Sequence, residues 1–219
     1  MKIQDTDPSI RVLLVDDHPV VRDGYRRLLE SSPGICVVAE ADDGEAGCIQ
    51  YKKYAPDVVV LDLSMPGIGG LETIRRIKAK DPDARILVFS MHSSETMIRH
   101  ALGAGAMGYL TKKSGVKQMV TAVRQIAQGK SFIDPEYVSG ISGERMYPSP
   151  EDPLEKLSSR EFQIFKMLAE GHAICEIAAT LSISSKTVGV HHTNIMKKLG
   201  FQNPAQIVRL ALRSNIIQP

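Results

Sequence analysis

The segment VVVLDLSMPG, residues 58–67, decides the fold of the first half of the chain. Its first four residues are apolar, three of them β-branched, and they lead directly into Asp62. A run this short and this apolar is typical of a strand that is buried on both faces, as in a parallel sheet. Pro66 and Gly67 then interrupt the pattern. The segment therefore predicts a buried strand with Asp62 at its carboxyl end.

Four more apolar runs of this kind lie around the first one within residues 1–128: Ile10–Val15, Ile35–Ala39, Arg85–Ser90 and Met107–Leu110. The stretches between them have helical periodicity, for example Val20–Glu30, Leu71–Lys80 and Val116–Gln128. Strands that alternate with helices predict a doubly wound α/β domain with helices on both faces of its sheet. Right-handed crossovers favour a five-stranded parallel sheet with the order 2-1-3-4-5.

The rest of the chain has a different pattern. Residues 129–153 show no periodicity, are rich in Pro, Gly and Ser, and carry a net charge of −3, so they are expected to form a linker. Residues 154–219 carry +4 and have only helical patterns, at Ser159–Glu170, Ile174–Leu181, Lys186–Leu199 and Pro204–Arg213. We therefore expect an α/β domain at 1–128, a linker at 129–153 and an all-α four-helix domain at 154–219, whose basic charge suits DNA.

The composition is that of an ordinary globular protein. Hydrophobic residues make up 43% of the 219 residues and charged residues 24%. No apolar run approaches the roughly 18 to 20 residues that a bilayer requires, and the first ten residues lack the apolar core of a signal peptide. The three cysteines are odd in number and far apart, which suits a reducing compartment. We expect a cytoplasmic protein with no membrane partner.

Polar residues stand at the ends of the predicted strands. Asp16 and Asp17 follow the first strand and Asp62 the third, while Ser90 ends the fourth and Lys112 follows the fifth. The carboxyl ends of parallel strands form the ligand site of such a sheet. Three carboxylates there repel one another unless a cation lies among them, and oxygen ligands suit Mg²⁺. We expect Asp62 to be a nucleophile for a phosphoryl group, with Ser90 and Lys112 binding phosphoryl oxygens.

In four segments the chain resembles the receiver domain of two-component response regulators: VDDHP (15–19), LDLSMPG (61–67), FSMH (89–92) and GYLTK (108–112). The resemblance extends over nearly all of residues 9–128. It implies that a sensor histidine kinase phosphorylates Asp62. It also implies that Ser90 and Tyr109 reorient on phosphorylation. The metal ligands that it implies for Mg²⁺ are Asp16, Asp17, Asp62 and the main-chain carbonyl of Ser64.

A short connector, Ser182–Ser185, joins two predicted helices, as in a helix-turn-helix whose second helix enters the major groove. A turn of 100° per residue places Val188, Ile195 and Leu199 on one face of this helix, where they form a core stripe. The opposite face is the candidate DNA-contacting face, with Lys186, Gly189, Val190, Thr193, Asn194 and Lys197. Taken alone, the helix also fits a solvated amphipathic helix.

The wider segment resembles the LuxR-type helix-turn-helix over about residues 154–216, in LSSRE (157–161), EIA (176–178), LSIS (181–184) and KTV (186–188). With the receiver, the chain is similar to the NarL/FixJ class of response regulators. The resemblance implies DNA recognition by Lys186–Lys198, which includes Thr187, and a dimer contact on Pro204–Arg213. Gly189 and Cys175 depart from it, because long polar residues and lysine are frequent at these positions.

The expected function is transcription regulation through phosphorylation-dependent homodimerisation, with a sensor histidine kinase and double-stranded DNA as partners and no enzymatic turnover. Two alternatives remain open at this point. A phosphatase with an aspartyl-phosphate intermediate, similar to the haloacid dehalogenase family, requires Asp-x-Asp, whereas Asp62 is followed by Leu63 and Ser64. An adaptor whose helical domain binds protein would fail to select any DNA from a randomised pool.

Overall fold

The computed structural model describes residues 9–91, 94–137, 153–214 and 216–217. They form two compact units: residues up to 91 together with 105–134, and residues 92–104 together with those from 135 onward. Residues 138–152 of the predicted linker lie outside the described residues, as does His92.

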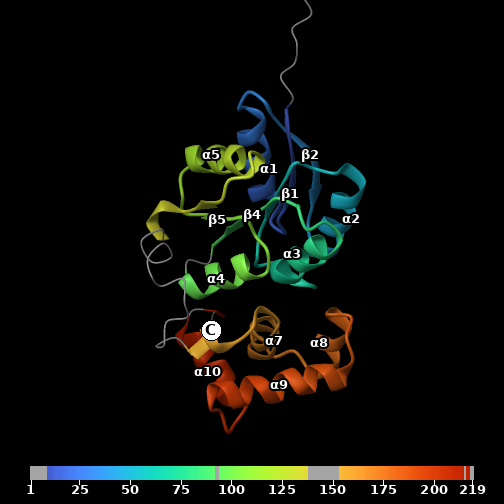
Figure 1. Ribbon diagram of the computed structural model, residues 1–219, viewed down its shortest axis with the longest axis vertical. Coiled ribbons are helices and arrows are strands. Elements are labelled where there is room, and N and C mark those ends of the chain that lie inside the picture. The colour runs from blue at the N-terminus through green and yellow to red at the C-terminus, as the bar shows by residue number, and fades with distance from the viewer. Residues whose placement is uncertain (1–8, 92–93, 138–152, 215, 218–219) are drawn as a thin grey trace, which may run out of the picture. The chain divides into compact units, whose positions relative to one another are not determined.

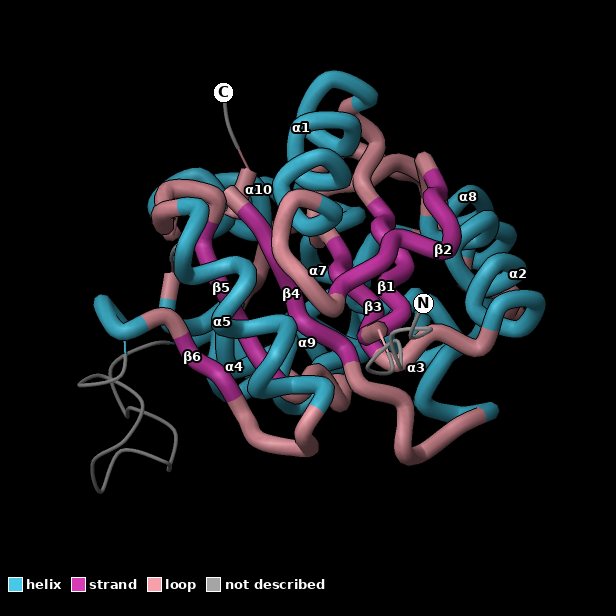
Figure 2. The backbone as a smooth tube through the Cα atoms, turned by 90° about the horizontal axis from the view of Figure 1, so that it is seen from above, coloured by secondary structure: helices cyan, strands magenta, loops and turns pink. Residues whose placement is uncertain are grey.

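The first unit contains a parallel sheet with the order β2-β1-β3-β4-β5-β6 (Figure 2). Its strands are β1 (Ile10–Val15), β2 (Ile35–Ala41), β3 (Val58–Leu61), β4 (Ile86–Ser90), β5 (Gly108–Thr111) and β6 (Phe132–Ile133). The predicted fold class and the order of the first five strands are confirmed. The sheet also has a sixth strand, inside the segment expected to be a linker. β6 has only two residues, so no alternating pattern reveals it in the sequence.

Helices cover both faces of this sheet, with α1 and α5 on one side and α2 and α3 on the other (Figure 1). Their bounds are α1 (Pro19–Glu30), α2 (Gly44–Tyr54), α3 (Gly69–Lys80) and α5 (Val116–Ala127). Leu14 and Val60 of the sheet share a buried cluster with Leu29 of α1 and Ile126 of α5. Alternate strand residues point to the opposite face. Accordingly, a Cβ added at Gly47 of α2 would lie 3.0 Å from Cγ1 of Val15.

The first turn of α3 packs directly on the backbone that follows β3. A Cβ added at Gly70 would lie 2.4 Å from the carbonyl oxygen of Asp62 and 2.6 Å from Cα of Leu63. Backbone atoms cannot rotate away as a side chain can, so this close approach requires glycine. Gly70 thereby fixes the position of the loop that begins at Asp62.

The second unit is helical. It contains α4 (Glu95–Gly103), the 3-10 turn η2 (Pro153–Lys156), α7 (Ser159–Ala169), α8 (Ile174–Thr180), α9 (Ser185–Leu199) and α10 (Ala205–Arg213). The ends of α7 to α10 lie within one residue of the predicted bounds. Phe162, Ile177, Val188 and Ile195 are fully buried and form the core of the unit. The ring of His100 in α4 stacks on Phe162 of α7, with the ring centroids 3.8 Å apart.

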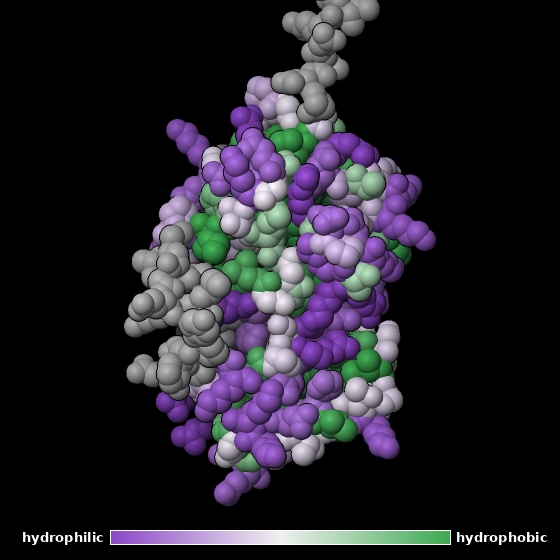
Figure 3. All heavy atoms as spheres, in the orientation of Figure 1, coloured by the Kyte–Doolittle hydropathy of each residue, from purple (hydrophilic) through white to green (hydrophobic). Residues whose placement is uncertain are grey.

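The longest described helix, α9, has 15 residues, fewer than the roughly 20 that span a bilayer. Within the part of the chain that the structure describes, no helix is long and apolar enough to cross a membrane. On the face drawn in Figure 3, hydrophobic residues are scattered among hydrophilic ones. Cys36, Cys48 and Cys175 are free thiols.

Two helical glycines give opposite expectations for substitution by alanine. Gly70→Ala should lower the free energy of unfolding by about 2 kcal/mol or more, because the new Cβ meets backbone at Asp62 and Leu63. Gly24→Ala in α1 is the matched control, since a Cβ there meets nothing within 4 Å. It should raise stability by up to about 1 kcal/mol through helix propensity. Urea denaturation followed by circular dichroism measures both changes. Equal stability of Gly70→Ala and the wild type would contradict the close packing of α3.

Candidate functional site

Asp62 is held at the end of β3 by its own loop and by the neighbouring strand. Its side chain is buried, and the residue is only 3% exposed. The backbone N–H of Asp62 donates to the carbonyl oxygen of Val15 in β1 at 2.9 Å, which continues the pairing of the two strands. The backbone N–H of Ser64 donates to Oδ1 of Asp62 at 3.1 Å. One carboxylate oxygen of Asp62 is therefore oriented by the loop that Gly70 supports.

Lys112 binds the other oxygen and joins two carboxylates. Its Nζ lies 2.6 Å from Oδ2 of Asp16 and 2.6 Å from Oδ2 of Asp62. Burial works to lower the pKa of Lys112, but the hydrogen bonds and negative charges of Asp16 and Asp62 outweigh it and hold this pKa above its usual value. The ammonium group is therefore charged and offsets part of the repulsion between the two carboxylates.

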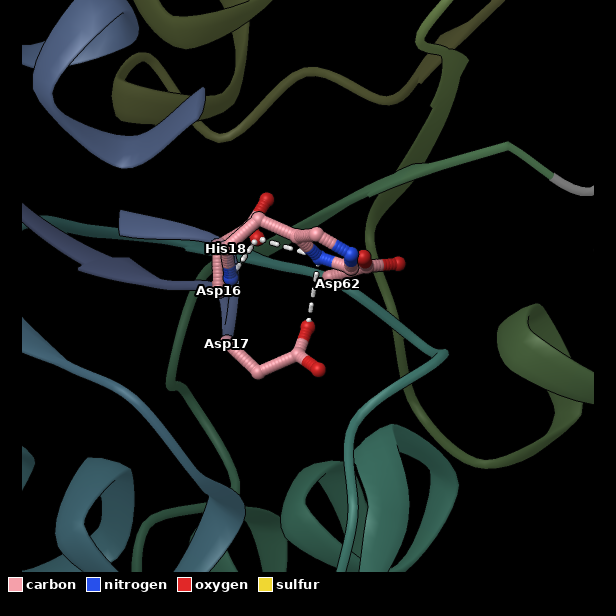
Figure 4. Close-up of side chains that lie close together, drawn as sticks. All are labelled: Asp16, Asp17, His18 and Asp62. Carbon is pink, nitrogen blue, oxygen red and sulfur yellow. Dashed lines mark hydrogen bonds and ion pairs between the residues drawn. The ribbon is translucent and has the colours of Figure 1, made fainter. Parts of the chain in front are cut away.

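Asp17 and His18 complete the acidic cluster (Figure 4). One ligand atom each from Asp16, Asp17, His18 and Asp62 lies within 4.8 Å of the others. Oδ1 of Asp17 is buried and accepts no hydrogen bond, although Nδ1 of His18 lies 2.9 Å away. A buried carboxylate oxygen without a donor is costly unless a cation binds it. Three carboxylates, one with such an oxygen, fit a hard divalent cation such as Mg²⁺.

Ser90, the last residue of β4, and Tyr109, the second residue of β5, are fully buried. Strand register places Ser90 beside Thr111, and Val88 beside Tyr109. The carbonyl oxygen of Ser90 accepts a hydrogen bond from the backbone N–H of Lys112 at 2.8 Å. The predicted switch residues therefore lie on β5, which leads to Lys112, and on β4, which is hydrogen-bonded to Lys112.

Two side chains of α1 reach the site although nothing in the sequence marks them. Arg22 and Tyr25 line a small pocket beside Asp16 and Asp62. Nη1 of Arg22 donates to the carbonyl oxygen of Asp16 at 2.5 Å. The Tyr25 ring packs edge-on against Phe89, with centroids 4.5 Å apart. Their spacing of three residues puts both on one helix face, but that pattern does not distinguish a site from ordinary packing.

In the second unit, the exposure of α9 residues follows the predicted faces. Val188 and Ile195 are fully buried, and Leu199 is half-buried. On the opposite face Gly189 is half-buried, and Lys186, Val190, Thr193, Asn194 and Lys197 are exposed. Thr187, which the resemblance adds, is exposed as well. Val190 is 53% exposed although it is apolar. A Cβ added at Gly189 would meet nothing within 4 Å, so a side chain has room there.

The helix that carries this face is tied to the start of α7 through Glu161. Ser158 and Glu161 form a capping box: the backbone N–H of Ser158 donates to Oε2 of Glu161 at 2.8 Å, and Oγ of Ser158 accepts from the N–H of Glu161 at 3.3 Å. Nζ of Lys198 in α9 lies 2.6 Å from the same Oε2. Burial works to raise the pKa of Glu161, but the bonds from Lys198 and Ser158 outweigh it and hold this pKa below its usual 4.5.

Two protein families match the chain. Residues 12–124 match the response regulator receiver domain, and residues 155–211 match the bacterial regulatory proteins of the luxR family. The first match includes the whole acidic cluster, and the second includes the helices α7 to α9. Together the two matches cover most of both units.

Whole proteins with the same two parts are similar to the chain. It is 36% identical over 209 residues to the response regulator GacA of Pseudomonas aeruginosa, covering 95% of this chain and 98% of GacA. It is 37% identical over 208 residues to the response regulator UvrY of Escherichia coli strain K12, covering 94% and 95%. Among solved structures, RcsB from Salmonella enterica serovar Typhimurium, bound to the rprA promoter in the presence of the phosphomimetic BeF3⁻, is 28% identical with a TM-score of 0.72, covering 92% of this chain and 98% of RcsB.

Glu161→Gln should destabilise the second unit at neutral pH by about 1–3 kcal/mol, because the capping bonds and the Lys198 bond lose their charged acceptor. A carboxyl group whose pKa is lowered by folding stabilises above its unfolded pKa and loses this effect as the pH falls through its folded pKa. The difference from wild type should therefore shrink below about pH 4.5. Urea denaturation at neutral pH and at several acidic pH values measures it.

Glu176→Gln is the matched control. Oε2 of Glu176 accepts from the backbone N–H of Ala173 at 2.8 Å in the same position of α8, but its side chain is 61% exposed. Glu176→Gln should lower the free energy of unfolding by less than about 1 kcal/mol. A Glu161→Gln difference that stays constant down to pH 3 would show that the charge of Glu161 contributes nothing.

Proposed function

Because this chain belongs to the response regulators that join a receiver domain to a LuxR-type DNA-binding domain, we propose that phosphorylation of Asp62 controls its binding to DNA. The family consists of transcription regulators and not of enzymes, so the phosphatase alternative falls away. The domain limits that we propose are 1–128 for the receiver, 129–153 for the linker and 154–219 for the DNA-binding domain, with β6 and Asp134 at the start of the linker attached to the receiver sheet.

The observation that carries the proposal is the buried carboxylate of Asp62 with Nζ of Lys112 at 2.6 Å. A carboxylate oxygen of Asp62 attacks the phosphorus atom of a phosphohistidine on a sensor histidine kinase. A new O–P bond forms as the P–N bond breaks, and the histidine nitrogen keeps the electron pair. The Lys112 ammonium is then in place to neutralise a phosphoryl oxygen, where a charge-assisted hydrogen bond is strong.

The acidic cluster supplies ligands for the cation that this transfer requires. Asp16, Asp17, Asp62 and the main-chain carbonyl of Ser64 would hold Mg²⁺, and the three carboxylates, each with an oxygen within 4.8 Å of the others, support this. When bound, Mg²⁺ neutralises charge on the incoming phosphoryl oxygens. We assign Ser90 and Tyr109 to the response: Ser90 bonds a phosphoryl oxygen, and the buried Tyr109 ring reorients with it.

The exposed face of α9 supports binding in the major groove. Lys186 and Lys197 suit phosphate contacts, while Thr193 and Asn194 suit base edges or backbone. Thr187 lies in the first turn of α9, where its hydroxyl is 2.7 Å from Oγ of Ser184. We assign to it a DNA contact at this end of the helix. Val190, apolar and exposed, fits the methyl group of a thymine.

A homodimer would hold two such helices on one DNA. Val208 and Leu212 of α10 are 38% and 36% exposed. Their spacing of four residues puts them on one helix face, which supports a dimer contact. Joining two modules makes the second DNA contact intramolecular and raises avidity by about 10²–10⁴. Phosphorylation acts in this scheme by favouring the receiver conformation that pairs.

The first test follows phosphorylation and its effect together. With Mg²⁺ and acetyl phosphate, the full-length protein should gain one acid-labile phosphoryl group, dimerise in sedimentation and bind DNA with two half-sites more tightly. Asp62→Asn should abolish all three changes, and removal of Mg²⁺ with a chelator should stop the phosphoryl gain, because the carboxylates then repel the donor.

Labelling of Asp62→Asn to the wild-type level would contradict the assignment of Asp62. Identical DNA affinity and identical mass in the phosphorylated and unphosphorylated states would contradict the switch, even with Asp62 correctly assigned. Failure to select any DNA from a randomised pool would favour a protein-binding role for the second unit.

A second test separates two kinds of contact on α9. Lys197→Ala should weaken binding to all sequences alike and reduce the slope of log affinity against log salt by about one unit. Val190→Ala should change the preference at one base position, with a cost of about 1 kcal/mol. Selection from a randomised pool at several salt concentrations measures both. An unchanged motif for Val190→Ala would rule out the thymine contact.

A further inference from the structure

Asp134 is a buried carboxylate inside the segment that the sequence indicates as linker. It directly follows β6 and is only 3% exposed. Its backbone N–H donates to the carbonyl oxygen of Tyr109 at 2.8 Å, so it extends the pairing of β6 with β5 by one hydrogen bond. A buried carboxylate is costly unless donors surround it. Its hydrogen-bond partners therefore show what the residue holds in place.

Three donors, from the last residue of β5 and from the loop after it, converge on Oδ2 of Asp134. The backbone N–H of Thr111 lies 3.2 Å away and the Thr111 hydroxyl 2.9 Å away. The hydroxyl of Ser114 is also hydrogen-bonded to Oδ2. The two hydroxyls lie 2.9 Å from each other, so they form one network with the carboxylate. We call these three residues, Thr111, Ser114 and Asp134, the Asp134 clasp.

Two residues of the clasp, Thr111 and Ser114, flank Lys112 in the chain. The backbone of Lys112 is also bound on its other side, where its N–H donates to the carbonyl oxygen of Ser90 in β4 at 2.8 Å. A lysine side chain is a flexible stem, so the place of its ammonium group depends on a fixed backbone and on its carboxylate partners. Phosphoryl transfer would change one of those partners, Asp62, whereas Asp134 is hydrogen-bonded to Thr111 and Ser114 and not to Asp62.

We propose that Asp134 is a positioning residue that holds the loop of Lys112 through Thr111 and Ser114, and so keeps the ammonium group where phosphoryl transfer to Asp62 needs it. This inference rests on the proposed function of Asp62. Asp134 acts through the loop and is separate from the reacting atoms. A receiver domain that ends at residue 128 would lack this carboxylate.

The first measurement needs no phosphodonor. A brief reaction of the full-length protein with an amine acetylating reagent, followed by peptide mass spectrometry, gives the modification of Lys112 relative to exposed Lys52. Asp134→Ala should raise the modification of Lys112 several-fold. Asp134→Asn, which keeps an acceptor oxygen without the charge, should raise this modification less. Ser114→Ala, which removes one donor, should act in the same direction and serves if Asp134→Ala does not fold.

Two residues serve as controls for this measurement. Oδ2 of Asp57 accepts from the backbone N–H of Arg11 at 2.7 Å at the opposite end of the sheet, so Asp57→Ala removes a comparable bond far from Lys112. It should leave Lys112 as in the wild type. Lys78, whose Nζ donates to the carbonyl oxygen of Pro82 at 2.7 Å, reports general loosening. Its modification should not change.

The second measurement is the rate of phosphorylation by acetyl phosphate at varied donor and Mg²⁺ concentrations. Asp134→Ala should lower the rate constant at saturating donor about tenfold, since a displaced ammonium stabilises the transferring group less. The half-saturating concentrations of donor and Mg²⁺ should stay the same, because the acidic cluster remains in place. Asp134→Asn should restore part of the rate.

The proposal is overturned if Lys112 in folded Asp134→Ala is modified as slowly as in the wild type, or if Lys78 rises in parallel with it. A wild-type phosphorylation rate in Asp134→Ala would also overturn it. A further outcome is that modification of Lys112 rises in Asp134→Ala as expected while even the wild type gains no phosphoryl group on Asp62. That outcome would support the role of Asp134 in holding the loop of Lys112 and would contradict the proposed function.

Discussion

The ammonium group of Lys112 lies between two carboxylates that would otherwise repel each other, and the acidic site of the first unit depends on this contact. β1 and β3 are neighbours in register, with Val15 beside Leu61, so the residues that follow them, Asp16 and Asp62, end up side by side. Lys112 directly follows β5, which lies two strands from β3 and three from β1, and its side chain reaches both carboxylates. Asp17 adds a further negative charge beyond what one lysine neutralises. The surplus of negative charge makes this sheet edge a place for a cation and a phosphoryl group together.

The buried strands made most of this site predictable from the sequence. A strand buried on both faces is a continuous apolar run, and the first polar residue after it marks the carboxyl end, as at Asp62. The same argument does not reach β6 or Asp134, because two residues have no period and the bonds of Asp134 join it to residues 20 and 23 positions earlier. Arg22 and Tyr25 could not be predicted as site residues for a related reason. Their place in the pocket follows from the packing of α1, and the sequence of α1 shows only which helix face is turned inward.

Two adjacent lysines in α9 show where helical periodicity stops being informative. A turn of 100° separates Lys197 from Lys198, and the first lies on the exposed face that we propose for DNA contact. The second is hydrogen-bonded to Glu161, 37 residues earlier in the chain, and joins the end of α9 to the start of α7. The basic excess of the domain therefore includes a charge whose role is structural. Net charge predicts a DNA-binding module, but only the fold shows how its positive charges are divided between stability and contact.

Gly189 has a consequence for how regulators of this kind diverge. It lies on the face of α9 that we propose for DNA contact, its φ is not positive, and a Cβ added there would meet nothing within 4 Å. A new side chain can arise there by a single substitution without any repacking of the core. Ancestral copies that duplicate can thus acquire different target genes at this position while the fold and the acidic cluster stay the same. Position 189 can therefore change the DNA preference of the protein without altering the residues that maintain its structure.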